Sequence, residues 1–192
     1  MIRTMALSHA VEQTWRNGGG STRELLAWPE AGNWVLRISV AAIARDGPFS
    51  TFAGVQRWFA VLRGDGVMLR LGDGPITLTS EDPPLAFDGA TAPFCELLGG
   101  PTQDLNLMLR PDAGSGRMAR ALAGEEWFSQ APVRAVYTLD PVWLQIDDSD
   151  ALAIDADSLA WHEDAAAQRW RLRAPGDDTV RALWMEFTPC PR

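Results

Sequence analysis

Residues 15–25, with the sequence WRNGGGSTREL, combine three glycines with side chains that can hydrogen-bond a ligand. Glycine lets the backbone approach a bound group closely or adopt a positive φ. Around the glycines, Asn17, Thr22, Arg23 and Glu24 supply amide, hydroxyl, guanidinium and carboxylate groups. The segment has neither the lysine of a phosphate-binding P-loop nor the spacing of a dinucleotide fingerprint. It predicts either a site for a small polar ligand or a glycine-rich bend that leads into a strand.

A second unusual segment, residues 45–57, begins with the turn signal Asp-Gly-Pro and continues with large apolar and polar side chains. Phe49 and Phe52 provide apolar surface, and Ser50 and Arg57 lie beside them in the sequence. This composition suits the wall of a pocket, and it equally suits a loop that covers the end of a barrel.

Arginines recur on the polar faces of predicted strands. Alternation over residues 34–40 places Arg37 and Ser39 opposite an apolar face, and alternation over residues 104–110 does the same for Asp104 and Asn106. A guanidinium that points into a barrel needs an anionic partner, because an unpaired buried charge is costly. That partner is an internal carboxylate, an anionic ligand or both; the internal candidates are Glu24, Asp46 and Asp104.

The elements that must position these residues are short strands, because glycines and prolines punctuate brief apolar runs along the whole chain. Asp-Gly turns predict a β-meander over residues 57–80. Residues 116–128 fit either one helix or a strand with a turn. Further strands are expected at residues 22–26, 34–40, 104–110, 133–137, 142–146, 170–173 and 182–187.

Composition excludes several classes of function. The 192 residues include 17 basic and 25 acidic side chains, and the net charge of −8 argues against nucleic acid or an anionic membrane as a partner. There is no lysine, so Schiff-base chemistry is excluded. Two cysteines and two histidines are too few and too separated for the usual metal site, so we expect no metal and no cofactor. Without an apolar leader or an apolar span, the expected location is the cytoplasm.

Three ordered blocks, residues 15–25, 37–57 and 99–108, together resemble the HutD/Ves family. The resemblance implies a cupin-like (RmlC-like jelly roll) double barrel, a bicupin with few or no helices, formed by residues 1–192 as one unit. Its approximate halves are expected at 1–112 and 113–192, sharing a core. The family is associated with bacterial histidine utilisation, and its Ves branch is linked to stress.

The resemblance implies a small anionic metabolite of the urocanate or formylglutamate type as the ligand, bound without catalysis. Arg37 and Arg57 are expected to clamp its carboxylate, with no catalytic residue. The alternatives are a metal-independent isomerase or hydrolase that uses Glu24, Asp46 or Asp104 as a base, and a stress-linked protein-interaction role. A homodimer is left open. The expected ligand-binding residues are Asn17, Thr22, Arg23, Glu24, Arg37, Ser39, Phe49, Ser50, Phe52, Arg57, Asp104 and Asn106.

Overall fold

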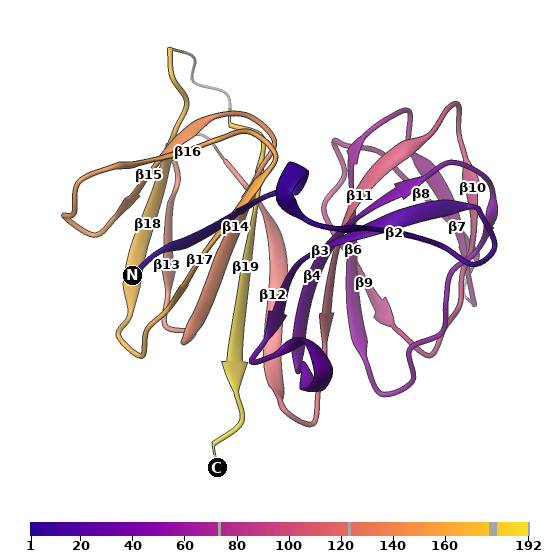
Figure 1. Ribbon diagram of the computed structural model, residues 1–192, viewed down its shortest axis with the longest axis horizontal. Coiled ribbons are helices and arrows are strands. Elements are labelled where there is room, and N and C mark those ends of the chain that lie inside the picture. Colours follow the sequence, from indigo (N-terminus) through magenta and orange to yellow (C-terminus); the bar gives the residue numbers. More distant parts are fainter. Residues whose placement is uncertain (73, 123, 177–179, 192) are drawn as a thin grey trace. The chain divides into compact units, whose positions relative to one another are not determined.

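The computed structural model describes residues 1–72, 74–122, 124–176 and 180–191, and these residues form β-strands joined by turns (Figure 1). Only two short 3-10 helices occur in this part of the chain, η1 (Leu7–His9) and η2 (Ala31–Asn33). The predicted all-β class is confirmed. Within the described ranges, no helix is both long and apolar enough to cross a membrane.

The chain divides into two compact units. Residues 11–114 form the N-terminal unit, and residues 1–10 together with 115–192 form the C-terminal unit. The first ten residues thus group with the second half of the sequence, because β1 (Arg3–Ala6) pairs antiparallel with β17 (Ser158–Glu163). That the two halves share a core stays a prediction.

Two sheets build the N-terminal unit. β5 (Gly47–Pro48), β10 (Phe94–Leu97), β7 (Val67–Leu71) and β8 (Gly74–Leu78) form a four-stranded sheet. The other sheet has six strands, in the order β2 (Glu12–Thr14), β3 (Gly20–Trp28), β4 (Leu36–Ile43), β11 (Thr102–Leu109), β6 (Gln56–Arg63) and β9 (Leu85–Asp88).

Both faces of the central strand β4 are buried. Leu36 and Ile38 lie on one face, while Ser39 and Ala41 alternate with them on the other. The second face joins an apolar cluster that includes Ile43, Phe59 and residues of the four-stranded sheet. The polar face that the alternation predicts therefore lies inside the unit.

The predicted meander over residues 57–80 is wrong in its first pairing. β7 pairs with β8 as expected, but β6 lies in the six-stranded sheet, where its neighbours are β11 and β9. The turn between β6 and β7 carries the chain from one sheet to the other through Gly64 and Gly66, both at positive φ. Turn chemistry predicts where the chain reverses but not which strand pairs with it. Asp73, which belongs to the second predicted turn, is outside the described residues.

The C-terminal unit also has two sheets. One has the order β1, β17, β14 (Val133–Thr138), β19 (Ala182–Pro189) and β12 (Gly114–Ala121). The other has the order β13 (Glu126–Ser129), β18 (Gln168–Arg173), β15 (Val142–Ile146) and β16 (Leu152–Ile154).

The open question of residues 116–128 is answered by β12 and β13, so this segment forms strands with a turn rather than a helix. Ala123, which lies between these strands in the sequence, is outside the described residues. The core of this unit is built around three tryptophans. Trp127 stacks on Trp184 with ring centroids 4.7 Å apart, and Trp170 packs edge-on against both.

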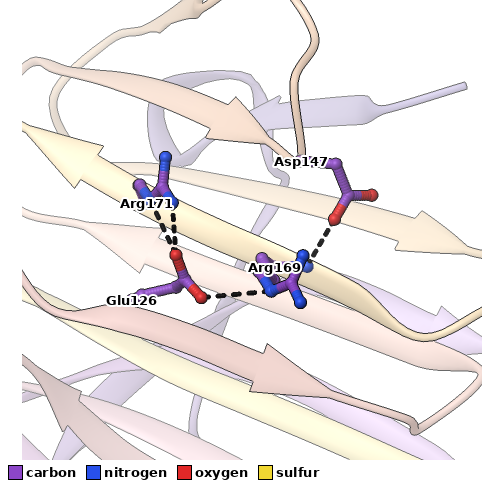
Figure 2. Close-up of polar contacts among 4 residues, drawn as sticks. All are labelled: Glu126, Asp147, Arg169 and Arg171. Atoms are coloured by element: carbon purple, nitrogen blue, oxygen red, sulfur yellow. Dashed lines mark hydrogen bonds and ion pairs between the residues drawn. The ribbon is translucent and has the colours of Figure 1, made fainter.

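Charged side chains occupy the solvent-facing side of β13 and β18, where Glu126 lies between two arginines (Figure 2). The Glu126 carboxylate accepts hydrogen bonds from Arg171 and forms an ion pair with Arg169 at 3.2 Å. The Asp147 carboxylate accepts a 2.9 Å hydrogen bond from the backbone N–H of Arg169. These side chains are well exposed, so the cluster belongs to the surface of the unit.

Candidate functional site

The N-terminal unit contains a cavity of about 540 Å³. Its rim is formed by exposed residues such as Arg16, Asn17 and Ser50, and its floor by the buried side chains Ser39, Arg57 and Asn106. The cavity is lined by Thr14, Trp15, Arg16, Asn17, Thr22, Arg37, Ser39, Ala41, Ile43, Pro48, Phe49, Ser50, Phe52, Arg57, Phe59, Asn106 and Met108. A volume of this size suits a small-molecule ligand.

Strand register brings the two central arginines together. On β11, Met108 lies opposite Arg37 of β4 on one side and opposite Arg57 of β6 on the other. Two residues away, Asn106 lies between Ser39 and Phe59 in the same way. Because side chains that alternate in step across a sheet share a face, these residues point into the same cavity.

Arg57 is a buried cation, 5% exposed, that makes no ion pair with any carboxylate among the described residues. Its Nη2 donates to Asn106 Oδ1 at 2.8 Å and its Nη1 to the Ser50 carbonyl at 3.5 Å, while its Nε has no hydrogen-bond partner. Burial, and secondly the charge of Arg37, lowers the pKa of Arg57 to about 10, so the side chain remains charged at neutral pH.

Aromatic rings surround the Arg57 guanidinium. Its Cζ lies 5.1 Å from the ring centre of Phe49, 5.6 Å from that of Phe52 and 5.1 Å from that of Phe87. Cation–π contacts of this kind partly compensate the loss of water around the charge. The rings hold the guanidinium in place without neutralising its positive charge.

Arg37 differs from Arg57 because it has a carboxylate partner. Its Nε donates to Glu24 Oε2 at 2.6 Å, and its Nη1 lies 4.0 Å from the sulfur of Met108. Glu24 reaches this position from β3, where it lies opposite Ser39 beside an irregularity in the strand pairing between Glu24 and Leu26.

The glycine-rich segment forms the turn from β2 to β3 and contributes to the rim. The Trp15 backbone N–H donates to the Gly20 carbonyl at 2.9 Å, and Trp15 Nε1 donates to Thr22 Oγ1 at 2.8 Å. Asn17 Oδ1 accepts from the Gly19 N–H at 2.9 Å. A Cβ at Gly20 would lie 2.3 Å from the Ala42 carbonyl oxygen. The glycine lets β3 approach β4 closely, so the segment both shapes the turn and lines the cavity.

Most of the residues expected to bind a ligand line this cavity. These are Asn17, Thr22, Arg37, Ser39, Phe49, Ser50, Phe52, Arg57 and Asn106. Their role in binding stays a prediction.

The structure places Arg23, Glu24 and Asp104 outside the cavity lining. Arg23 forms an ion pair with Glu12 at 3.1 Å, and Glu24 contacts Arg37. Asp104 is fully buried and accepts a 2.7 Å hydrogen bond from Thr102 Oγ1, while its Oδ1 has no partner. Burial raises the pKa of Asp104 to about 8, so this carboxyl group is mostly neutral at pH 7.

Sequence reasoning missed part of the lining. Ala41 and Ile43 continue the alternation of Arg37 and Ser39, and Met108 continues that of Asn106, so the same period of two could have identified them. Trp15 and Arg16 belong to a segment already singled out. Pro48 belongs to the Asp-Gly-Pro turn signal, while Phe59 and Thr14 carried no signal of their own.

The carboxylates considered as catalytic bases do not line the cavity. Glu24 pairs with Arg37, Asp46 accepts a hydrogen bond from the Leu97 N–H at 2.8 Å, and Asp104 is inaccessible to solvent. In the described ranges, no group of three or more His, Cys, Asp or Glu side chains is placed to hold a metal ion.

Comparison with known proteins shows the family to which the chain belongs. The family model described as HutD matches residues 7–180. The chain belongs to the HutD family. A relative named Protein Ves, from Citrobacter koseri, is 34% identical to this chain over 154 residues, which cover 78% of this chain and 77% of the relative.

Other relatives extend this result. An uncharacterised 21.2 kDa protein from the region 3′ of hutC in Pseudomonas putida is 37% identical over 116 residues, which is 59% of this chain and 57% of that protein. HutD from Pseudomonas fluorescens SBW25, whose structure is described as a formate condition, superposes with a TM-score of 0.86 at 26% identity over 100% of both chains.

The oxalate decarboxylase of Lactobacillus farciminis superposes with a TM-score of 0.63 at 11% identity, covering 97% of this chain and 86% of that one. At this identity the likeness concerns the fold alone. The fold of this HutD family member is cupin-like, as the sequence resemblance implies.

Proposed function

We propose that this HutD family protein binds a small carboxylate metabolite, of the urocanate or formylglutamate type, in the cavity of its N-terminal unit. By holding this metabolite it modulates histidine utilisation in the cytoplasm without catalysing a step. The single observation that carries the proposal is Arg57, a buried guanidinium in the cavity with an unpartnered Nε and no carboxylate partner among the described residues.

The energetic argument favours an anionic ligand. A buried charge without a counter-charge is destabilising, and a guanidinium matches a carboxylate with two parallel hydrogen bonds. Asp104, a buried carboxyl group on the same face of β11, is mostly neutral at pH 7 because burial raises its pKa to about 8, so it does not neutralise Arg57. A bound carboxylate would supply the missing counter-charge.

The relatives support the same class of ligand and the same pathway. The structure of the Pseudomonas fluorescens HutD is described as a formate condition, and formate is the smallest carboxylate. The Pseudomonas putida relative lies beside hutC, which agrees with the family's association with histidine utilisation.

Isothermal titration calorimetry with urocanate, formylglutamate and formate tests the proposal, using the parent protein and Arg57→Gln. We expect at least one of these acids to bind the parent and Arg57→Gln to weaken its affinity at least tenfold, because a charged hydrogen bond contributes about 1.5–3 kcal/mol. The matched control is Arg70→Gln. Arg70 lies on β7, pairs with Glu96 and does not line the cavity, so this variant should bind like the parent.

Three results would overturn the proposal. Equal affinity in the parent and in Arg57→Gln would show that Arg57 does not bind the carboxylate of the ligand. A failure of all three acids to bind would favour the stress-linked protein-interaction role. Conversion of any of these acids during incubation with the parent would favour the enzyme alternative.

A further inference from the structure

The buried end of the cavity carries two guanidinium groups, and among the described residues one carboxylate, that of Glu24, forms an ion pair with them. Arg37 is paired with Glu24, and Arg57 is paired with no described carboxylate, so the local charge is close to one positive unit. We infer that Glu24, through its ion pair with Arg37, makes the site selective for monoanionic carboxylates over dianions. This inference rests on the proposed function of the cavity and names the charge of its ligand.

The geometry of the ion pair explains why Glu24 alters charge without blocking the site. Glu24 accepts the hydrogen bond from Nε of Arg37, on the side of the guanidinium, and it does not line the cavity. No described residue accepts a hydrogen bond from Nη2 of Arg37. The Nη groups can therefore still donate hydrogen bonds to a ligand, although Glu24 already compensates the positive charge of Arg37.

The pair is also sheltered from water. The side chains of Arg37 and Glu24 are 15% and 28% exposed, so solvent screens their interaction less than it would at the open surface. A dianion that enters this end of the cavity brings a second negative charge close to Glu24, and like charges repel strongly where water is scarce.

Among the described residues, the rest of the buried lining supplies no further cation for a second carboxylate. Phe49 and Phe59 form apolar walls, and the buried side chains of Ser39 and Asn106 are polar but uncharged. Arg16 is the remaining cation of the lining, and it lies at the exposed rim, where salt and water weaken its attraction.

An isosteric pair of ligands isolates the effect of charge. N-formylglutamate has two carboxylates, and N-formylglutamine replaces the side-chain carboxylate with an amide of the same shape. We expect the parent protein, titrated by calorimetry at pH 7, to bind N-formylglutamine at least fivefold more tightly than N-formylglutamate.

Removing the compensating charge should change this ratio. Glu24→Gln should shift the affinity ratio at least fivefold toward the dianion. The matched control is Glu12→Gln, which removes a carboxylate from the Arg23 ion pair on β2 and β3, outside the cavity lining, and it should keep the parent ratio. Arg16 is present in all variants, so it cancels when their ratios are compared.

If Glu24→Gln does not fold, Arg37→Gln provides the test instead. Arg37→Gln removes a positive charge from the site, so the affinity ratio should shift in the opposite direction. In that variant the ratio should move at least fivefold toward the monoanion. A ratio that is unchanged in whichever of the two variants folds, or one that favours the dianion in the parent, would overturn the inference while the proposed function stands. If neither formylated ligand, urocanate nor formate binds the parent, the proposed function fails and the inference fails with it.

Discussion

Arg37 and Arg57 lie on opposite sides of Met108, on strands separated by β11 alone, and both side chains line the same cavity. Neighbouring strands lie about 4.8 Å apart, so the two backbones are separated by roughly 10 Å. Glu24 compensates Arg37 and nothing charged compensates Arg57 among the described residues. On this asymmetry rests the proposal that the cavity binds an anion.

The close approach of β3 and β4 depends on Gly20. We expect Gly20→Ala to destabilise the protein by more than about 2 kcal/mol, because its Cβ would lie 2.3 Å from the Ala42 carbonyl oxygen and the strands would have to separate. Urea unfolding measures this loss. Gly32→Ala is the control, since nothing lies within 4 Å of a Cβ there, and its midpoint should stay near that of the parent. Equal midpoints for both variants would contradict the packing of β3 on β4.

Asp104 predicts a dependence of stability on pH. Its pKa is raised from 3.8 in the unfolded chain to about 8 in the folded protein, so between these values the folded state holds a proton that the unfolded state has lost. Stability from this group is complete below about pH 4 and is lost as the pH rises toward 8, by up to about 1.4 kcal/mol per pH unit.

Asp104→Asn removes that proton equilibrium while keeping an acceptor for Thr102 Oγ1. The free energy of unfolding of the parent, measured relative to Asp104→Asn at pH 5, 6.5 and 8, should therefore fall steadily. A difference that is constant across these pH values would show that the Asp104 carboxyl group is not buried as described.

The Glu126 cluster on the surface of the C-terminal unit should contribute little to stability. Its side chains are exposed by 37% for Glu126, 59% for Arg169 and 44% for Arg171. Exposed ion pairs contribute about 0–1 kcal/mol. Glu126→Gln should therefore lower the free energy of unfolding by less than about 1 kcal/mol, with a smaller effect in 1 M salt. A larger loss that persists in salt would indicate a role beyond a surface ion pair.

The sequence predicts strands well where alternation and turn signals agree. Residues 142–146 form β15 with the predicted bounds. It does not predict that β11 takes the place beside β6 or that β1 pairs with β17, because these pairings join residues that are far apart in the chain. Their partners are set by packing of the whole unit rather than by local propensity.

The residues of the candidate site are likewise predicted only in part by local sequence patterns. Alternation identifies Arg37 and Ser39 as one polar face, but it does not decide which of Thr22 and Arg23 faces the cavity, since adjacent residues of a strand point to opposite faces. The structure places Thr22 in the lining and pairs Arg23 with Glu12. Likewise, Asp104 and Asn106 share a face of β11, and only Asn106 reaches the cavity, because burial along a strand depends on the opposing sheet.

The central claim is that Arg57 binds an anionic ligand, and its most direct test is the substitution Asn106→Asp. Asn106 Oδ1 already accepts a hydrogen bond from Arg57 at 2.8 Å, so an aspartate of the same shape would place a carboxylate against the guanidinium. The measurement is calorimetric titration of the parent and the variant with the carboxylate that binds the parent. We predict that Asn106→Asp weakens this binding at least tenfold while the folded protein remains at least as stable as the parent. Unchanged affinity in a folded Asn106→Asp protein would contradict the account.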